Sequence, residues 1–308
     1  MSRAIDRART AVAAMAAPGL NLLAVSGGAD SLALAVAASQ LRGEFGAVIV
    51  DHGLQDNSAQ VAQRAAGQCR DLGLAPVLVR RVDTRSDEAS ARAARYKAFE
   101  KVRQSTGAQR ILLGHTRDDQ AEQVLLGLLR GSGTRSLAGI PAVRGVFARP
   151  LLELTRKDTE QICAAAGLEY WEDPSNADTS YRRNLVRQQI LPFLSHALGE
   201  HIPQALARTA QLAAQDAQAL EQWAQQAWEE HGVNLAALAA LPPAVASRVL
   251  RLAAVDAGAK NVGQERTAAL CALAGIGVEK SKSAGPVQLD GKISAYRRSP
   301  VIVFTDSR

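Results

Sequence analysis

The stretch LNLLAVSGGADSLALAV, residues 20–36, joins an apolar, strand-like run to a helix-like run through a short polar turn. A glycine-rich turn of this kind surrounds an anion with backbone N–H groups and the positive end of the helix. We expect Gly27 and Gly28 to adopt positive φ, and Ser26 and Ser31 to add hydroxyl donors. The turn therefore predicts a phosphate site, with a plain tight turn as the alternative.

The turn differs from two familiar nucleotide-binding loops. No Lys follows its second Gly, as the Gly-x-x-x-x-Gly-Lys-Ser/Thr loop requires, and its Gly spacing does not fit Gly-x-Gly-x-x-Gly. It carries Asp30 instead, and a carboxylate beside a phosphate is favourable where a cation bridges the two. The sequence therefore predicts a cation next to this loop.

Short apolar runs alternate with longer amphipathic runs on both sides of the turn. The apolar runs, which predict buried strands, are residues 20–25, 47–50, 76–82 and 110–114. The helix-like runs are residues 30–41, 57–72, 87–105 and 117–130. This alternation predicts an α/β fold, a Rossmann-like doubly wound parallel sheet with right-handed crossovers. Ligands of such sheets bind beyond the carboxyl ends of the strands, where this sequence places polar stretches.

The alternation stops near residue 150. We expect a first domain over residues 1–195, a helical connector over 196–232, and a small C-terminal α(+β) domain over 233–308. An Asp-Gly pair at residues 290–291 lies between two alternating runs and predicts a β-hairpin.

Charge and cysteine content restrict the class of protein. The net charge of +6 and the pI near 9.5 suit a polyanionic partner. Cys69, Cys163 and Cys271 are far apart, so neither a disulfide framework nor a cysteine-built metal site is indicated. The Arg-led, Ala-rich N-terminus is too weakly apolar for a signal peptide, and no run suits a membrane helix. We expect a cytoplasmic protein that does not enter the membrane.

The motif Ser-Gly-Gly-x-Asp-Ser at the end of the first strand resembles the pyrophosphate loop of the N-type ATP pyrophosphatases. Enzymes of this family cleave ATP between the α and β phosphates. The resemblance implies the adenine nucleotide alpha hydrolase-like fold, and a loop that holds the leaving phosphates. The residues it assigns to ATP binding are Ser26, Gly27, Gly28, Ala29, Asp30 and Ser31.

Further stretches are similar, in order and spacing, to the tRNA(Ile)-lysidine synthetases. They are VDHGL (50–54), ASARAARYKAFE (89–100), LGHTRDDQAEQVLLGLLRGSG (113–133), RPLL (149–152) and DPSNADTSYRRNLVRQQILP (173–192). The similarity makes the first domain a PP-loop catalytic domain and fades over the last hundred residues. The basic residues of the C-terminal domain, residues 233–308, could contact the acceptor stem, so we expect a tRNA-binding domain there.

This resemblance implies ligation of L-lysine to the wobble cytidine of the CAU anticodon in tRNA(Ile). The cytosine carbonyl oxygen attacks the α-phosphate of ATP, releasing pyrophosphate, and the lysine side-chain amine then displaces AMP. Both steps gather charge on phosphate oxygens, so cations and fixed N–H donors should dominate catalysis. The implied ion is Mg²⁺, with Asp30 as its ligand or water anchor.

The resemblance also assigns roles to single residues. The implied catalytic residues are Asp30, Arg92, His115 and Asp119; the implied lysine ligands are Asp119 and Glu122; the implied adenosine contacts are Asp51 and His52. The implied tRNA contacts are Arg95, Arg182, Arg183 and Arg187. The sequence departs from the family at Gln123, where Thr usually follows the Glu.

Structural roles remain as alternatives for several of these residues. Asp119 and Glu122 could complement the dipole of a helix N-terminus. Interdomain salt bridges are the alternative for Arg182, Arg183 and Arg187. A different PP-loop tRNA-modifying enzyme, such as a thiolase, or a non-catalytic RNA-binding relative are the rival functions. The sequence leaves the oligomeric state, monomer or homodimer, open.

Overall fold

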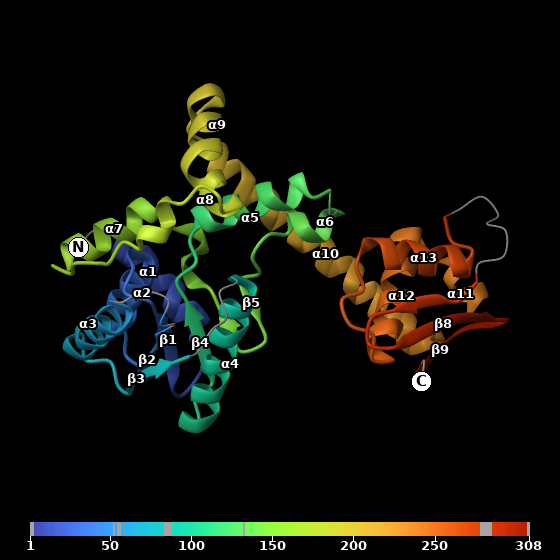
Figure 1. The fold of residues 1–308 in the computed structure, drawn as a ribbon, viewed down its shortest axis with the longest axis horizontal. Coiled ribbons are helices and arrows are strands. Elements are labelled where there is room, and N and C mark those ends of the chain that lie inside the picture. The colour runs from blue at the N-terminus through green and yellow to red at the C-terminus, as the bar shows by residue number, and fades with distance from the viewer. Residues whose placement is uncertain are drawn as a thin grey trace. The chain divides into compact units, whose positions relative to one another are not determined.

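The computed structural model describes residues 3–51, 53, 57–82, 88–131, 133–277 and 285–306. The chain forms two compact units, Met1–Gln211 and Leu212–Arg308. The division lies inside the long helix α10 (Ile202–His231), within the segment expected as a helical connector. Each unit is described by itself below (Figure 1).

The first unit is built on a six-stranded sheet in the order β3-β2-β1-β4-β6-β5. Its strands are β1 (Asn21–Val25), β2 (Phe45–Asp51), β3 (Val77–Arg81), β4 (Arg110–Leu113), β5 (Val143–Arg144) and β6 (Phe147–Ala148). All neighbours are parallel except β5 and β6. The predicted doubly wound parallel sheet is confirmed, and each of its four long strands lies where an apolar run predicts it.

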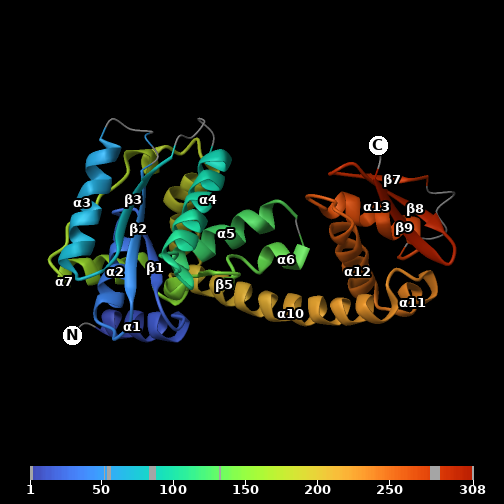
Figure 2. The same cartoon turned by 90° about the horizontal axis from the view of Figure 1, so that it is seen from below.

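Helices cover both faces of this sheet, as Figure 2 shows. On one face α1 (Arg3–Met15), α2 (Ala29–Ser39), α3 (Ser58–Asp71) and α7 (Arg156–Ala165) share a buried core. On the other face α4 (Glu88–Thr106) packs through Phe99 and Val102 against β1, β2 and β4. The change of face falls between the adjacent strands β1 and β4, which is the switch point where such sheets bind ligands.

The remaining segments of this unit, apart from the start of α10, are helical. They are α5 (Arg117–Leu129), α6 (Gly133–Leu137), η1 (Pro150–Glu153), η2 (Pro174–Ala177), α8 (Arg182–Leu185), η3 (Val186–Ile190) and α9 (Leu191–Leu198). The basic N-terminal segment forms α1, whose Ala8 and Val12 are fully buried. The segment that superficially resembles a signal peptide is therefore part of the folded unit.

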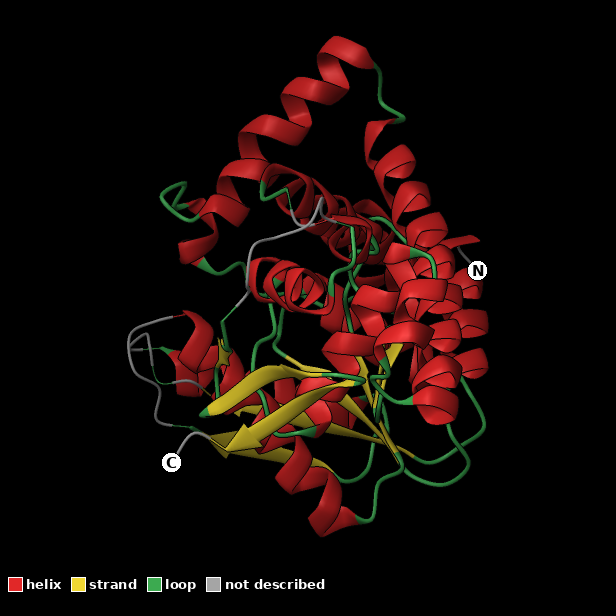
Figure 3. Ribbon diagram, turned by 90° about the vertical axis from the view of Figure 1, so that its right-hand side faces the viewer, coloured by secondary structure: helices red, strands yellow, loops and turns green. Residues whose placement is uncertain are grey.

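The second unit combines helices with a three-stranded antiparallel sheet. Its elements after α10 are α11 (Leu235–Ala240), α12 (Pro243–Asp256), α13 (Gln264–Ala274), β7 (Val287–Leu289), β8 (Ile293–Arg298) and β9 (Val301–Asp306). The predicted hairpin is confirmed as β7 and β8, with Gly291 at φ 90° in the turn. Figure 3 shows that helices predominate and that strands are confined to the two sheets. No helix in the described ranges has the length and apolar character needed to span a bilayer.

Candidate active site

The loop between β1 and α2 is closed by its own serine side chains. Ser31 Oγ accepts a hydrogen bond from the Ser26 amide at 3.1 Å and donates to the Gly28 carbonyl oxygen at 2.9 Å. Gly27 has the expected positive φ, 88°. Gly28 does not: its φ of −79° and ψ of 162° are extended, because it is the N-cap residue from which α2 begins. The expectation of positive φ at Gly28 was therefore wrong.

Asp30 lies in the first turn of α2 and is held by side chains of α7. Its carboxylate accepts a hydrogen bond from Thr159 Oγ1 at 2.5 Å and lies 3.4 Å from Arg156 Nη1. Burial raises the pKa of Asp30 to about 6, although Thr159 and Arg156 oppose the shift. The negative charge of Asp30 is thus only partly compensated by the protein.

A cation would supply the missing compensation. Mg²⁺ is commonly bound by one or two carboxylates together with substrate phosphates rather than by an all-protein cage. In the described part of the chain no three His, Cys, Asp or Glu side chains gather as a metal-ligand set. A single carboxylate beside a phosphate loop fits an ion that arrives with a nucleotide, and the assignment of Mg²⁺ to Asp30 stays a prediction.

Gly114, at the end of β4, brings the fourth strand against the loop. A Cβ atom there would lie 2.9 Å from the carbonyl oxygen of Asp30 and 3.1 Å from Cα of Ser31. Both neighbours are backbone atoms, which cannot turn aside. The close approach of β4 to the first turn of α2 therefore requires a residue without a side chain.

We expect Gly114→Ala to lower the free energy of unfolding by about 1–3 kcal/mol, because the backbone must move to admit the methyl group. Gly67→Ala is the matched control, since a Cβ there meets nothing within 4 Å. In the middle of α3 that change should raise stability by about 0.5–1 kcal/mol. Urea denaturation of both variants measures the difference, and equal stabilities would contradict the packing argument.

Asp119 and Glu122 lie on the first two turns of α5. Asp119 Oδ2 accepts a hydrogen bond from the Thr116 amide at 2.9 Å and so caps the helix. Glu122 is fully buried. The capping role proposed as an alternative is thus real for Asp119, whereas Glu122 is inside the protein and needs a cationic partner.

Two arginines from α8 and η3 supply that partner. Arg183 Nε lies 2.8 Å from Glu122 Oε2, and Arg187 contacts both Glu122 oxygens, at 2.5 and 3.1 Å. Both guanidinium groups also reach Asp119 Oδ1, at 3.4 and 3.2 Å. Burial disfavours the charge of Asp119, yet Arg183, His115 and the Thr116 amide hold its pKa below the usual range. Two expected lysine ligands and two expected tRNA contacts therefore form one charged cluster within the first unit.

His115 lies in the short loop between β4 and α5, near several arginines. Burial lowers its pKa to about 4, with Asp119 opposing the shift and Arg149, Arg183 and Arg92 adding to it. Its Nδ1 atom is buried and has no hydrogen-bond partner among the described residues. The imidazole is therefore neutral at pH 7, and it can exchange a hydrogen bond with a ligand rather than a charge.

We expect the His115 imidazole to titrate near pH 4 in an NMR titration of the folded protein, far below its ordinary value of 6.5. Between pH 6.5 and pH 4 the His115 imidazole is protonated in the unfolded chain but neutral in the folded protein. Protonation therefore favours the unfolded chain, and the free energy of unfolding falls as the pH is lowered from 6.5 to 4. In Asp119→Asn the pKa should drop further, because the opposing charge is removed. A midpoint near 6.5 would show that the imidazole is solvated.

Arg149 is a residue of this site that the sequence analysis missed. It is 4% exposed, and no carboxylate of the described residues lies within ion-pair distance. Its guanidinium donates to the Pro141 carbonyl oxygen at 2.8 Å and lies 3.5 Å from the Tyr96 hydroxyl. Arg92 stacks on the same tyrosine ring at 5.0 Å. Arg149 is the first residue of the RPLL stretch, so the family motif could have indicated that it belongs to the site.

The other expected site residues are less closely joined to this centre. Asp51 is buried at the end of β2 and accepts the Gly53 amide at 3.0 Å. Arg95 is half-buried on α4, and Arg182 is exposed at the start of α8. His52 lies outside the described residues. For these four residues the expected adenosine and tRNA contacts stay predictions.

Three comparisons relate this chain to known proteins. A family model described as "PP-loop domain" matches residues 4–194. A curated relative from Salinispora tropica, named tRNA(Ile)-lysidine synthase, is 46% identical over 98% of this chain and 96% of its own length. A relative of the same name from Leifsonia xyli is 44% identical over 94% of this chain and 90% of its own length. These alignments extend well past residue 195, where the motif resemblance ends.

A solved structure gives independent support for the fold. The U34-tRNA thiolase from Methanococcus maripaludis, determined with its 4Fe–4S cluster, has a TM-score of 0.58 and 15% identity. The match covers 69% of this chain and 78% of that chain. In the present chain, burial raises the pKa of Cys69 and of Cys163 to about 12, which keeps both thiols protonated and unreactive. The likeness to a thiolase is therefore one of fold.

Proposed function

Because this chain belongs to the tRNA(Ile)-lysidine synthase family and carries its PP-loop domain, we propose that it forms lysidine at the carboxyl edge of its first sheet. It is an ATP-dependent ligase that forms a carbon–nitrogen bond on tRNA(Ile). Gly114, at the end of β4, packs against the backbone of Asp30. Arg156 Nη1 lies 3.4 Å from Asp30 Oδ2, and the Arg156 amide donates to Asp118 Oδ2 of α5 at 2.9 Å. This juxtaposition of the phosphate loop and the start of α5 is the observation that carries the proposal.

The loop residues act first in the proposed reaction. The backbone N–H groups at the start of α2 face the β and γ phosphates, the groups that leave as pyrophosphate. Asp30 is the residue that would hold Mg²⁺, and this ion would neutralise charge on the phosphate oxygens. Neutral His115 and the nearby Arg92 are the groups available to the α-phosphate while the cytosine oxygen attacks it.

The α5 carboxylates act in the second half of the reaction. An ammonium group of lysine needs carboxylate acceptors, and half-buried Asp119 and buried Glu122 lie together on α5. Lysine must compete there with Arg183 and Arg187, whose guanidinium groups occupy the same oxygens. We infer that these arginines move toward RNA phosphates when lysine binds. They would then pair with Glu122 in the free protein and contact tRNA in the complex.

The proposal extends to the cellular compartment. All three cysteines, Cys69, Cys163 and Cys271, are free thiols, which supports a reducing cytoplasm.

One assay tests the proposed function. The protein is incubated with ATP, Mg²⁺, labelled lysine and transcripts of either isoleucine or methionine tRNA, and pyrophosphate and incorporated label are followed. We expect both products with the isoleucine transcript and neither with the methionine transcript. Pyrophosphate without incorporated lysine would refute the ligation and leave the adenylation step standing.

A further inference from the structure

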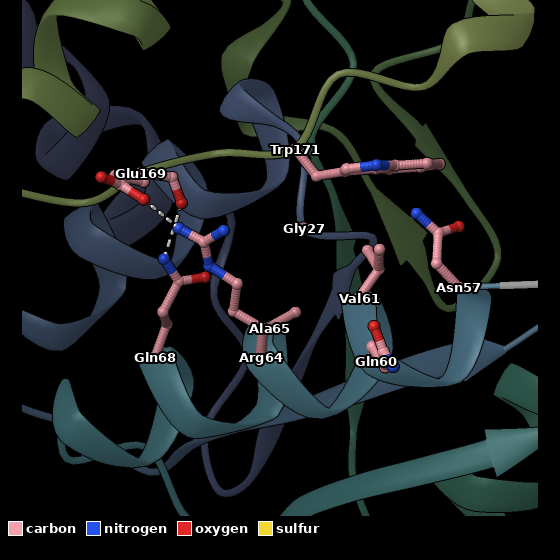
Figure 4. Close-up of a pocket in the computed structure, with 9 residues that line it drawn as sticks. All are labelled: Gly27, Asn57, Gln60, Val61, Arg64, Ala65, Gln68, Glu169 and Trp171. Carbon is pink, nitrogen blue, oxygen red and sulfur yellow. Dashed lines mark hydrogen bonds and ion pairs between the residues drawn. The ribbon is translucent and has the colours of Figure 1, made fainter.

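A groove lies beside Gly27 of the phosphate loop (Figure 4). Its volume is about 240 Å³. One wall is α3 and the other is the segment that follows α7. The lining residues are Gly27, Asn57, Gln60, Val61, Arg64, Ala65, Gln68, Glu169 and Trp171.

The indole of Trp171 forms a flat wall of this groove. Figure 4 shows the ring extended over Val61 and Asn57, with open space between the ring and α3. A backbone hydrogen bond holds the main chain of Trp171 against the loop, since the Trp171 amide donates to the Gly27 carbonyl oxygen at 2.9 Å. The space between a flat indole and the side chain of Val61 suits a planar ring.

The polar groups of the groove indicate what kind of ring it suits. Asn57 occupies the N-cap position of α3, yet its side chain makes no capping hydrogen bond, and its amide points toward the indole. The two charged side chains of the groove, Arg64 and Glu169, pair with each other. The Gln68 amide donates a hydrogen bond to the Glu169 carbonyl oxygen at 2.7 Å. An amide with a free donor and acceptor matches the hydrogen-bonding edge of a nucleobase.

We infer that this groove, named here the Trp171 slot, binds one unstacked nucleobase. Its volume is below the roughly 300–1,000 Å³ of pockets that enclose whole drug-sized ligands, so a single ring system is the expected occupant. The inference rests on the proposed function, because both proposed substrates carry bases: the adenine of ATP and the unpaired bases of an anticodon loop. Stacking on Trp171 and hydrogen bonds to Asn57 are the interactions that hold either one.

Direct binding measurements on the full chain test the slot without requiring turnover. The probes are Mg·ATP and an isoleucine anticodon stem-loop RNA, titrated into wild type, Trp171→Leu, Trp171→Phe and Asn57→Ala. Base stacking on an aromatic ring contributes about 1–3 kcal/mol, so Trp171→Leu should weaken one probe by roughly 5- to 150-fold. Trp171→Phe should recover most of that loss. The control, Trp223→Leu, removes an exposed indole of α10 and should change neither affinity.

The pattern of losses identifies the source of the base. A loss for the stem-loop alone assigns the slot to the RNA. A loss for ATP alone, with unchanged affinity for tripolyphosphate, assigns it to adenine. If Trp171→Leu is folded by circular dichroism and binds both probes like wild type, the inference is wrong, even where lysine incorporation by wild type upholds the proposed function. Wild type that binds both probes but incorporates no lysine would refute only the function.

Discussion

We expect Asp30→Asn to reduce ATP-dependent pyrophosphate release by at least about a hundredfold while making the protein more stable at pH 7. Asparagine keeps the size of the side chain and can still accept the hydrogen bond from Thr159 Oγ1. It removes the negative charge with which Asp30 would bind Mg²⁺. Loss of pyrophosphate release in a more stable protein would show that Asp30 acts in catalysis rather than in maintaining the fold.

The stability part of this prediction follows from the raised pKa of Asp30. Its pKa is about 6 in the folded protein against 3.8 in the absence of the fold. The folded state therefore binds the proton more tightly, and its stability declines as the pH rises from about 4 to about 6. Above that range the buried charge costs roughly 2–3 kcal/mol, which the asparagine variant avoids.

Thermal unfolding of both proteins at pH 7 and pH 4 measures the effect. The variant should unfold at a higher temperature at pH 7, and the two should converge at pH 4, where wild-type Asp30 is mostly protonated. A variant that releases pyrophosphate at the wild-type rate would remove Asp30 from the mechanism. A variant less stable at pH 7 would show that Arg156 compensates the charge more fully than the geometry indicates.

Glu122→Gln should raise the lysine concentration needed for half-maximal ligation by about tenfold or more, with pyrophosphate release preserved. The amide keeps the shape of the side chain but loses the charge that an ammonium group requires. It also leaves Arg183 and Arg187 with Asp119 as their shared partner. Breaking a buried ion pair costs about 3–5 kcal/mol, so the variant should also unfold more easily.

Two further variants test whether the effect comes from the ion pairs of Glu122. Glu122→Gln combined with Arg187→Gln should regain part of the lost stability, since one unpaired guanidinium is removed as well. Glu100→Gln, which breaks the half-buried surface pair with Arg103 on α4, should cost less than about 1 kcal/mol and leave the lysine requirement unchanged. An unchanged lysine requirement in Glu122→Gln would show that lysine binds elsewhere.

Much of the fold was predictable because its signals are local. The four apolar runs became β1 to β4, and the polar turn after residue 25 became the loop that begins α2. The strands β5 and β6 have two residues each and are too short to produce a period. The extended φ of Gly28 depends on where α2 begins, which composition does not determine.

The contacts within the site were harder to predict. Asp119 and Glu122 were recognisable from their place after a strand, but their pairing with Arg183 and Arg187 joins segments more than sixty positions apart. Arg149 lacks a local partner whose sequence position could reveal it. The Trp171 slot exists because the segment after α7 returns to Gly27, a contact that motif order does not indicate.

The helix cap at Asp119 restricts how this enzyme can be redesigned. The carboxylate that faces the arginines also holds the first turn of α5 through Thr116, so a substitution there changes amine recognition and weakens the cap of the helix at the same time. Among the described residues, the hydrogen bonds of the Glu122 side chain are with the arginine side chains and not with the backbone of α5. A library intended to accept shorter or longer diamines should therefore vary Glu122 and its arginine partners, and keep Asp119 fixed.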